Sequence, residues 1–192
     1  MPELPRNERY AGFTPRFAAR IVDALIMLPV LAMQYALLRY QWAVAWSLVL
    51  SFAFSLWFHV YLVSRYGGTP GKLLLDLRIA MADGTPVTAR AALKRQSVML
   101  VLMVCTSVAL VVGAARVDAA AWPTLGFVAR METVVRLAPA WYGAVRTASN
   151  VWEWSELLTL LFNEQRRALH DFIGGTVVLE TVTAAATASA RN

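Results

Sequence analysis

Residues 17–38, FAARIVDALIMLPVLAMQYALL, decide the fold of this chain. At about 1.5 Å of rise per residue, a helix of this length crosses the ~30 Å hydrocarbon core of a bilayer. The stretch nevertheless contains Asp23, with Arg16 and Arg20 just before it. A charge near the centre of such a helix costs about 2.5–3.5 kcal/mol by insertion scales, and it is tolerated where it faces protein or water. The stretch therefore predicts a membrane protein with a polar locus inside it.

The rest of the composition supports a membrane protein. The chain has 192 residues, of which 58% are hydrophobic and 16% charged, and its mean hydropathy is +0.52. Its apolar residues form long blocks instead of being dispersed at helix or strand periods, and residues 42–64 carry no formal charge. We expect helices at 17–38, 42–64 and 91–113. The first block is longer than the apolar part of a signal peptide and lacks a small-residue cleavage site, which indicates a retained anchor.

The segment after the third block is ambiguous. It contains eight charged residues, namely Arg116, Asp118, Arg130, Glu132, Arg136, Arg146, Glu153 and Glu156. Its apolar residues recur every three or four positions, which is typical of an amphipathic helix. We favour a fourth membrane helix at 138–162 whose polar stripe, including Arg146 and Glu153, faces the other helices. An interfacial segment is the alternative.

The sequence thus predicts an all-α membrane protein, a small bundle of about four transmembrane helices with short cytoplasmic β segments. Residues 76–81 read as a strand, followed by an Asp-Gly turn and a return strand at 82–87. Residues 175–180 give a second β signal, and we expect this segment to pair with 76–81. The expected organisation is a cytoplasmic amino-terminal arm at 1–16, a transmembrane domain at 17–179 and a flexible tail at 180–192.

Charge placement predicts the orientation. The net charge is +6, but the lysines and arginines stand at the ends of apolar blocks, which argues against a nucleic-acid partner. The amino-terminal arm to Arg16 has three basic residues, the turn after the first helix has one, and the 65–95 loop has six. Cytoplasmic loops are enriched in Lys and Arg, so the amino terminus and this loop should be cytoplasmic.

The first candidate site is a cluster on the first helix. Arg16, Arg20 and Asp23 are spaced by four and three residues and share one helical face. They form either an ion- or proton-responsive site or an ion pair that fixes packing. His59 follows a row of serines in the second helix and is a secondary candidate that more often serves packing. Lys72 ends a glycine-rich loop that misses the phosphate-loop spacing, so we expect a tight turn with Lys72 at the headgroup level.

His170 and Asp171 form an adjacent polar pair near the carboxyl-terminal end, and His170 is a secondary candidate. The chain has only two histidines, which excludes a His-rich metal site. The single cysteine, Cys105, lies within an apolar block where a thiol is inert. No nucleophile, base and orienting group converge in the sequence. We therefore expect no enzyme activity, no metal and no cofactor.

A set of short motifs resembles the RDD family of bacterial membrane proteins. The motifs are Ala11-Gly12-Phe13, Arg16-Phe17-Ala18-Ala19, Asp23, Gly68-Thr69-Pro70-Gly71-Lys72, Arg78-Ile79, Asp83-Gly84, Arg167-Ala168-Leu169-His170-Asp171 and Gly175-Thr176. The resemblance implies that Arg16 begins the first membrane helix, that Asp23 lies within it and that Asp171 is the second family aspartate. It also implies a multi-pass protein of the bacterial inner membrane, for which transport is one suggested role.

Two functions stay open at this point. In the first, a single polar cluster of Arg16, Arg20, Asp23 and Asp171 transports or senses an ion or small solute, with Asp23 as the intramembrane acid. In the second, the chain is a non-enzymatic assembly or scaffold module in which the same cluster is structural. The expected partners are the lipid bilayer and either a second copy of the chain or other membrane proteins.

Overall fold

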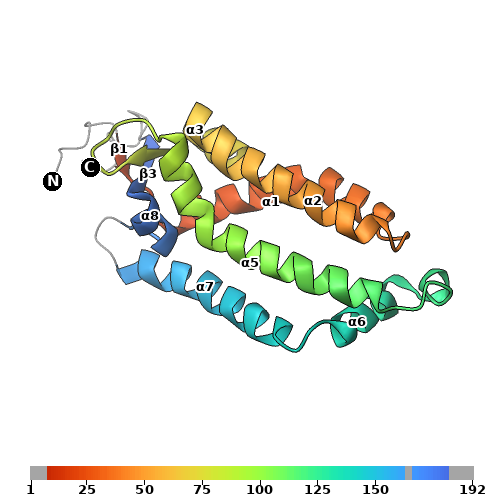
Figure 1. Ribbon diagram of the computed structural model, residues 1–192. Helices are drawn as coiled ribbons and strands as arrows, with labels where there is room; N and C mark the ends of the chain where they lie inside the picture. Colours follow the sequence, from red (N-terminus) through yellow and green to blue (C-terminus); the bar gives the residue numbers. More distant parts are fainter. Residues whose placement is uncertain (1–7, 163–165, 182–192) are drawn as a thin grey trace. The chain divides into compact units, whose positions relative to one another are not determined.

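The computed structural model describes residues 8–162 and 166–181, most of which are helical (Figure 1). The long helices are α1 (Phe13–Leu37), α2 (Ala43–Leu56), α5 (Ala89–Ala115) and α7 (Tyr142–Phe162). The short helical elements are a π-helical turn η1 (Trp57–Tyr61), α3 (Leu62–Tyr66), α4 (Pro70–Leu74), a 3-10 turn η2 (Trp122–Thr124), α6 (Phe127–Leu137) and α8 (Leu169–Gly174). The strands are β1 (Glu8–Tyr10), β2 (Leu77–Met81) and β3 (Thr176–Thr181).

Three of the described helical stretches are long and apolar enough to cross a membrane. They are Phe13–Leu37, Ala43–Tyr66 and Ala89–Ala115, and the second combines α2, η1 and α3. The three expected apolar spans are thus confirmed, with α1 beginning four residues early because Pro15 is tolerated in the first turn of a helix. Leu25 and Leu28 on α1 are 59% and 55% exposed, as expected for side chains that contact lipid.

The expected helix at 138–162 is shorter and more polar than a typical span. Ala138 ends α6 in an extended conformation because it precedes Pro139, and a residue before proline is disfavoured in a helix. Helix α7 therefore begins only at Tyr142. Its 21 residues include Arg146, Glu153 and Glu156, so it lacks the apolar character of the other three.

A small antiparallel sheet joins distant parts of the chain in the order β1-β3-β2. Strand β2 pairs with β3 from Leu77 opposite Glu180 to Met81 opposite Thr176, so the expected pairing forms. The expected return strand at 82–87 is wrong, because only an isolated bridge between Ala80 and Pro86 forms there.

The amino-terminal arm supplies the third strand, which the sequence did not predict. Tyr10 of β1 pairs with Leu179 of β3. Arg9 bonds to Glu180 at 3.1 Å, and Arg78 reaches Glu8 at 2.6 Å. The expected flexible tail overlaps the end of β3, and its residues 182–192 lie outside the described residues.

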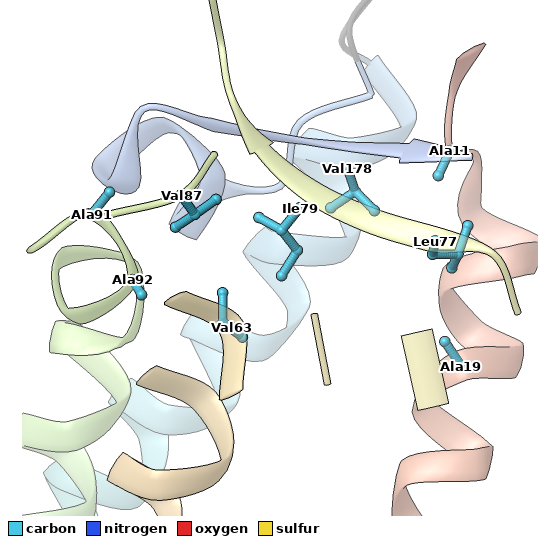
Figure 2. Packing of buried hydrophobic residues seen from close by; sticks show 9 residues of the cluster. All are labelled: Ala11, Ala19, Val63, Leu77, Ile79, Val87, Ala91, Ala92 and Val178. Carbon is cyan, nitrogen blue, oxygen red and sulfur yellow. The ribbon is translucent and has the colours of Figure 1, made fainter. Parts of the chain in front are cut away.

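The chain divides into two compact units, each with its own core. The first contains the described parts of Met1–Ile26, Leu56–Ser97 and Trp154–Asn192. Figure 2 shows its core, in which Ile79 and Val178 of the sheet lie over Val63 of α3 and Ala92 of α5. All four side chains are almost fully buried, so the sheet and the helices of this unit share one apolar core.

The second unit contains Met27–Ser55 and Val98–Glu153 and has a core built around Trp122. Its polar contacts run from side chains to backbone carbonyls. Buried Arg130 of α6 donates to the carbonyls of Leu38 at 2.9 Å and Leu125 at 2.8 Å, and its guanidinium lies 5.2 Å from the Trp122 ring centroid. Trp122 in turn donates to the carbonyl of Arg39 at 3.1 Å. These bonds attach α6 to the turn between α1 and α2.

Replacing Arg130 by Met should destabilise the second unit by about 2–3 kcal/mol, because two partly buried carbonyls lose a charged donor. The measurement is the thermal unfolding midpoint of the detergent-purified protein. Arg136→Met is the matched control on the same helix, since Arg136 is exposed. Equal midpoints for the two variants would contradict a structural role for Arg130.

Candidate functional site

Asp171 in α8 is the centre of the most buried ionic cluster among the described residues. Its carboxylate is fully buried and bonds to Arg16 of α1 at 2.8 Å and to Arg95 of α5 at 2.7 Å. The Thr176 hydroxyl and the Ala168 backbone N–H each donate to it at 3.1 Å. We call Arg16, Arg95 and Asp171 the clasp, because it joins the starts of two apolar helices to the carboxyl-terminal segment.

Arg16 binds one carboxylate and two backbone carbonyls within the first unit. Besides Asp171, its guanidinium donates to the carbonyl of Ala11 at 3.1 Å and to the carbonyl of Arg166 at 2.7 Å. Buried Arg95 contacts Asp171, Thr176 at 3.2 Å and the ring of His170 at 2.7 Å. The side-chain donors of both arginines therefore point at partners supplied by the chain itself.

The clasp keeps Asp171 ionised. Burial alone would raise the pKa of this carboxyl, but Arg95, His170 and Arg16 together hold the pKa of Asp171 well below its ordinary value. A depressed carboxyl pKa contributes stability at every pH above about 4, and this stability is lost only as the pH falls toward the folded-state pKa. The Asp171 carboxylate therefore stays deprotonated near neutral pH and does not take up a proton there.

Asp23 forms a second site instead of joining the clasp. Its carboxylate accepts from the Thr69 hydroxyl at 2.6 Å and from the Gly71 N–H at 2.7 Å. No hydrogen bond or ion pair between described residues joins Asp23 to Arg16 or Asp171, so Asp23 is not a direct partner of the other members of the expected cluster. The reason is that Arg16 turns toward Asp171 and two carbonyls, while the loop before α4 reaches Asp23.

Gly71 makes the Asp23 contact possible. A Cβ added at Gly71 would collide with the Ala19 carbonyl and would lie 2.8 Å from the Asp23 carboxyl carbon. Thr69 is buried and precedes Pro70, the first residue of α4. The glycine-rich loop, for which the sequence predicts a tight turn, therefore packs directly on α1.

The remaining candidates of the first unit lie around these two sites. His59 is half-buried in the π-helical turn η1, and Lys72, Arg95, Arg20 and His170 act on its ring electrostatically. Arg20 is exposed and also takes part in a further contact. Residues 8–162 and 166–181 contain no group of three His, Cys, Asp or Glu that could hold a metal ion.

Two secondary candidates lie elsewhere. Arg146 and Glu153 are exposed on the part of α7 that belongs to the second unit, and neither takes part in the clasp. Arg95 was counted in the sequence only as one basic loop residue among six. It stands beside Arg90 and Lys94 at the start of the same apolar helix, so no sequence signal separates it from its basic neighbours.

The structure defines a class of protein with three apolar, membrane-length helices and a buried Arg–Asp–Arg cluster beside a small sheet. The model of the RDD family matches residues 10–175. The chain therefore belongs to the RDD family. No curated protein and no solved structure matches it.

Proposed function

We propose that this RDD-family chain is a multi-pass protein of the bacterial inner membrane with four spans and a cytoplasmic amino terminus. The support is topological. Strand β1 precedes the first apolar span, β2 lies between the second and third, and β3 is hydrogen-bonded to both. The three strands must lie on one side of the membrane because they pair with one another. After the third apolar span the chain must therefore cross once more before it reaches β3, and α7 is the long helix between them. At about 1.5 Å per residue, α7 is ~31 Å long, which is enough to cross the hydrocarbon core of a bilayer.

This topology predicts the labelling of single cysteines placed in a Cys105→Ser background. Asp118→Cys, after the third span, should react with a membrane-impermeant maleimide on intact cells. Asp83→Cys, in the turn after β2, should react only after permeabilisation, because the basic 65–95 loop is cytoplasmic. A fluorescent protein fused after Asn192 should fluoresce. Labelling of Asp83→Cys on intact cells would overturn the orientation, and a dark fusion would overturn the fourth span.

We further propose that the chain is a non-enzymatic assembly module rather than a pathway. The observation that carries this is that both oxygens of each acid, of the buried Asp171 and of the partly buried Asp23, bind donors of the chain itself. Asp171 is bound by two arginines, and both oxygens of Asp23 accept hydrogen bonds from one loop. A carboxylate that carries protons or ions through a membrane needs a face open to its cargo, whereas these two hold helices, loop and sheet together.

Asp23→Asn separates this role from the transport or sensing of an ion or small solute. The amide oxygen can still accept from the Gly71 N–H, and the amide N–H can donate to the Thr69 hydroxyl, but both bonds lose the carboxylate charge, so we expect a loss of about 1 kcal/mol. The melting midpoint should fall, and proteoliposomes of the wild type should show no flux of protons, sodium or potassium. Flux in the wild type that disappears in an equally stable Asp23→Asn variant would overturn the assembly role.

A further inference from the structure

Helix α7 carries a row of polar residues on its exposed side. Gly143, Arg146, Asn150 and Glu153 follow one another at intervals of three, four and three residues, so they share one face of the helix. All four are exposed, and a Cβ added at Gly143 would meet nothing within 4 Å. We call these four residues the polar seam, and all of them belong to the second unit.

Helix α5 of the same unit shows the chemistry of a face that suits lipid. Val101, Val104 and Val108 are spaced by three and four residues and are 61%, 45% and 49% exposed. The polar seam has the same helical spacing, but with charged and amide side chains in place of valines. Such side chains within a membrane normally face protein or water. The polar seam is therefore ill suited to contact with hydrocarbon.

The proposed fourth span gives the polar seam its depth, and the inference that follows rests on that span. At about 1.5 Å per residue, Arg146 lies ~6 Å and Glu153 ~16 Å along α7 from Tyr142, in a hydrocarbon core of ~30 Å. Arg146 can extend its guanidinium to the nearer membrane surface, whereas Glu153 stays near the middle of the core. The exposed side of α7 at this depth must therefore be covered by a polar partner.

A second copy of the chain fits the polar seam, because the polar seam is complementary to itself. It carries one positive and one negative charge, so two copies meet without excess charge. In a parallel pair about a two-fold axis, Asn150 faces its own counterpart, and an amide both donates and accepts hydrogen bonds. Arg146 and Glu153 lie four and three residues away, which lets the opposite Asn150 accept from the arginine and donate to the carboxylate. Gly143 allows the two backbones to approach closely.

We propose that the polar seam pairs with the polar seam of a second copy of the chain, in a parallel dimer within the membrane. The pairing names a partner for the assembly role, and it uses none of the clasp residues, which belong to the first unit. A chain with an altered polar seam should therefore stay folded and lose its partner.

The test measures the association of full-length chains in liposomes. Asp83→Cys in a Cys105→Ser background carries a donor or an acceptor maleimide dye, and energy transfer is followed as the protein-to-lipid ratio rises. Chains with an intact polar seam should show saturable transfer that unlabelled chains compete away. Asn150→Leu should weaken the dimer by about tenfold or more, because the change acts on both copies. Val151→Leu is the matched control, since this neighbouring residue is 63% exposed on a different face and should leave association unchanged.

Two further measurements separate pairing from folding and from topology. In detergent dilute enough to keep all chains monomeric, the unfolding midpoint of Asn150→Leu should not fall, because Asn150 is exposed, and a lower midpoint would overturn the polar seam as a free face. No transfer above random proximity with an intact polar seam, or equal association for Asn150→Leu and Val151→Leu, would overturn the dimer. If the fusion after Asn192 fluoresces beside such a result, the pairing alone is rejected, whereas a dark fusion rejects the fourth span and the pairing with it.

Discussion

Replacing Asp171 by Asn should destabilise the protein by about 3–5 kcal/mol, because it leaves two buried arginines without their shared counter-charge. Arg16 and Arg95 approach opposite oxygens of this carboxylate at 2.8 and 2.7 Å, and an amide cannot accept from both. The Ala168 N–H and the Thr176 hydroxyl also bind opposite oxygens, so one of these two donors loses its acceptor as well. We expect a sharply lower yield of folded protein and a lower unfolding midpoint in detergent.

The control for this prediction removes all three charges. In Arg16→Met/Arg95→Met/Asp171→Leu no buried charge is left unpaired, and replacement of buried ion pairs by apolar residues is often neutral or stabilising. The triple variant should therefore be more stable than Asp171→Asn alone. If the triple variant were the less stable of the two, the clasp would not be an ordinary buried ion cluster and its cost would have another origin.

The positions of the apolar spans could be predicted from the sequence because the signal is local. Each span is a block of apolar residues whose ends are fixed by charges, as in residues 42–64. The pairing of β2 with β3 was predictable for the same reason, since both segments have a high local β propensity. Strand β1 was not, because three residues in a polar arm have no pattern of their own and become a strand only by pairing with β3.

The partners of the acids could not be predicted, because they are set by tertiary contacts. Helical spacing favours Arg20 or Arg16 as the partner of Asp23, yet the structure pairs Asp23 with Thr69 and Gly71. Arg95 was indistinguishable from the other basic residues that end an apolar block, because such residues are normal at the cytoplasmic end of any span. Only the approach of α8 to α5, where Gly174 packs against Arg95, identifies it as part of the clasp.

Replacing Gly71 by Ala should destabilise the first unit by about 3 kcal/mol or more, through overpacking and the loss of hydrogen bonds to Asp23. The new methyl group would meet the backbone of α1 at Ala19, which cannot move aside as a flexible side chain would. To relieve the collision, α4 must shift away from α1, and the Thr69 and Gly71 donors then leave the carboxylate.

The matched control for Gly71→Ala is Gly143→Ala on α7. A Cβ added at Gly143 meets nothing within 4 Å, and alanine is the better helix former, so this variant should be unchanged or slightly more stable. Thermal unfolding of both variants in the same detergent gives the comparison. Because Gly71→Ala acts by displacing the loop from Asp23, combining it with Asp23→Asn should cost less than the sum of the two single changes. Strict additivity would show that the loop and the acid are stabilised independently, contrary to the contacts seen here.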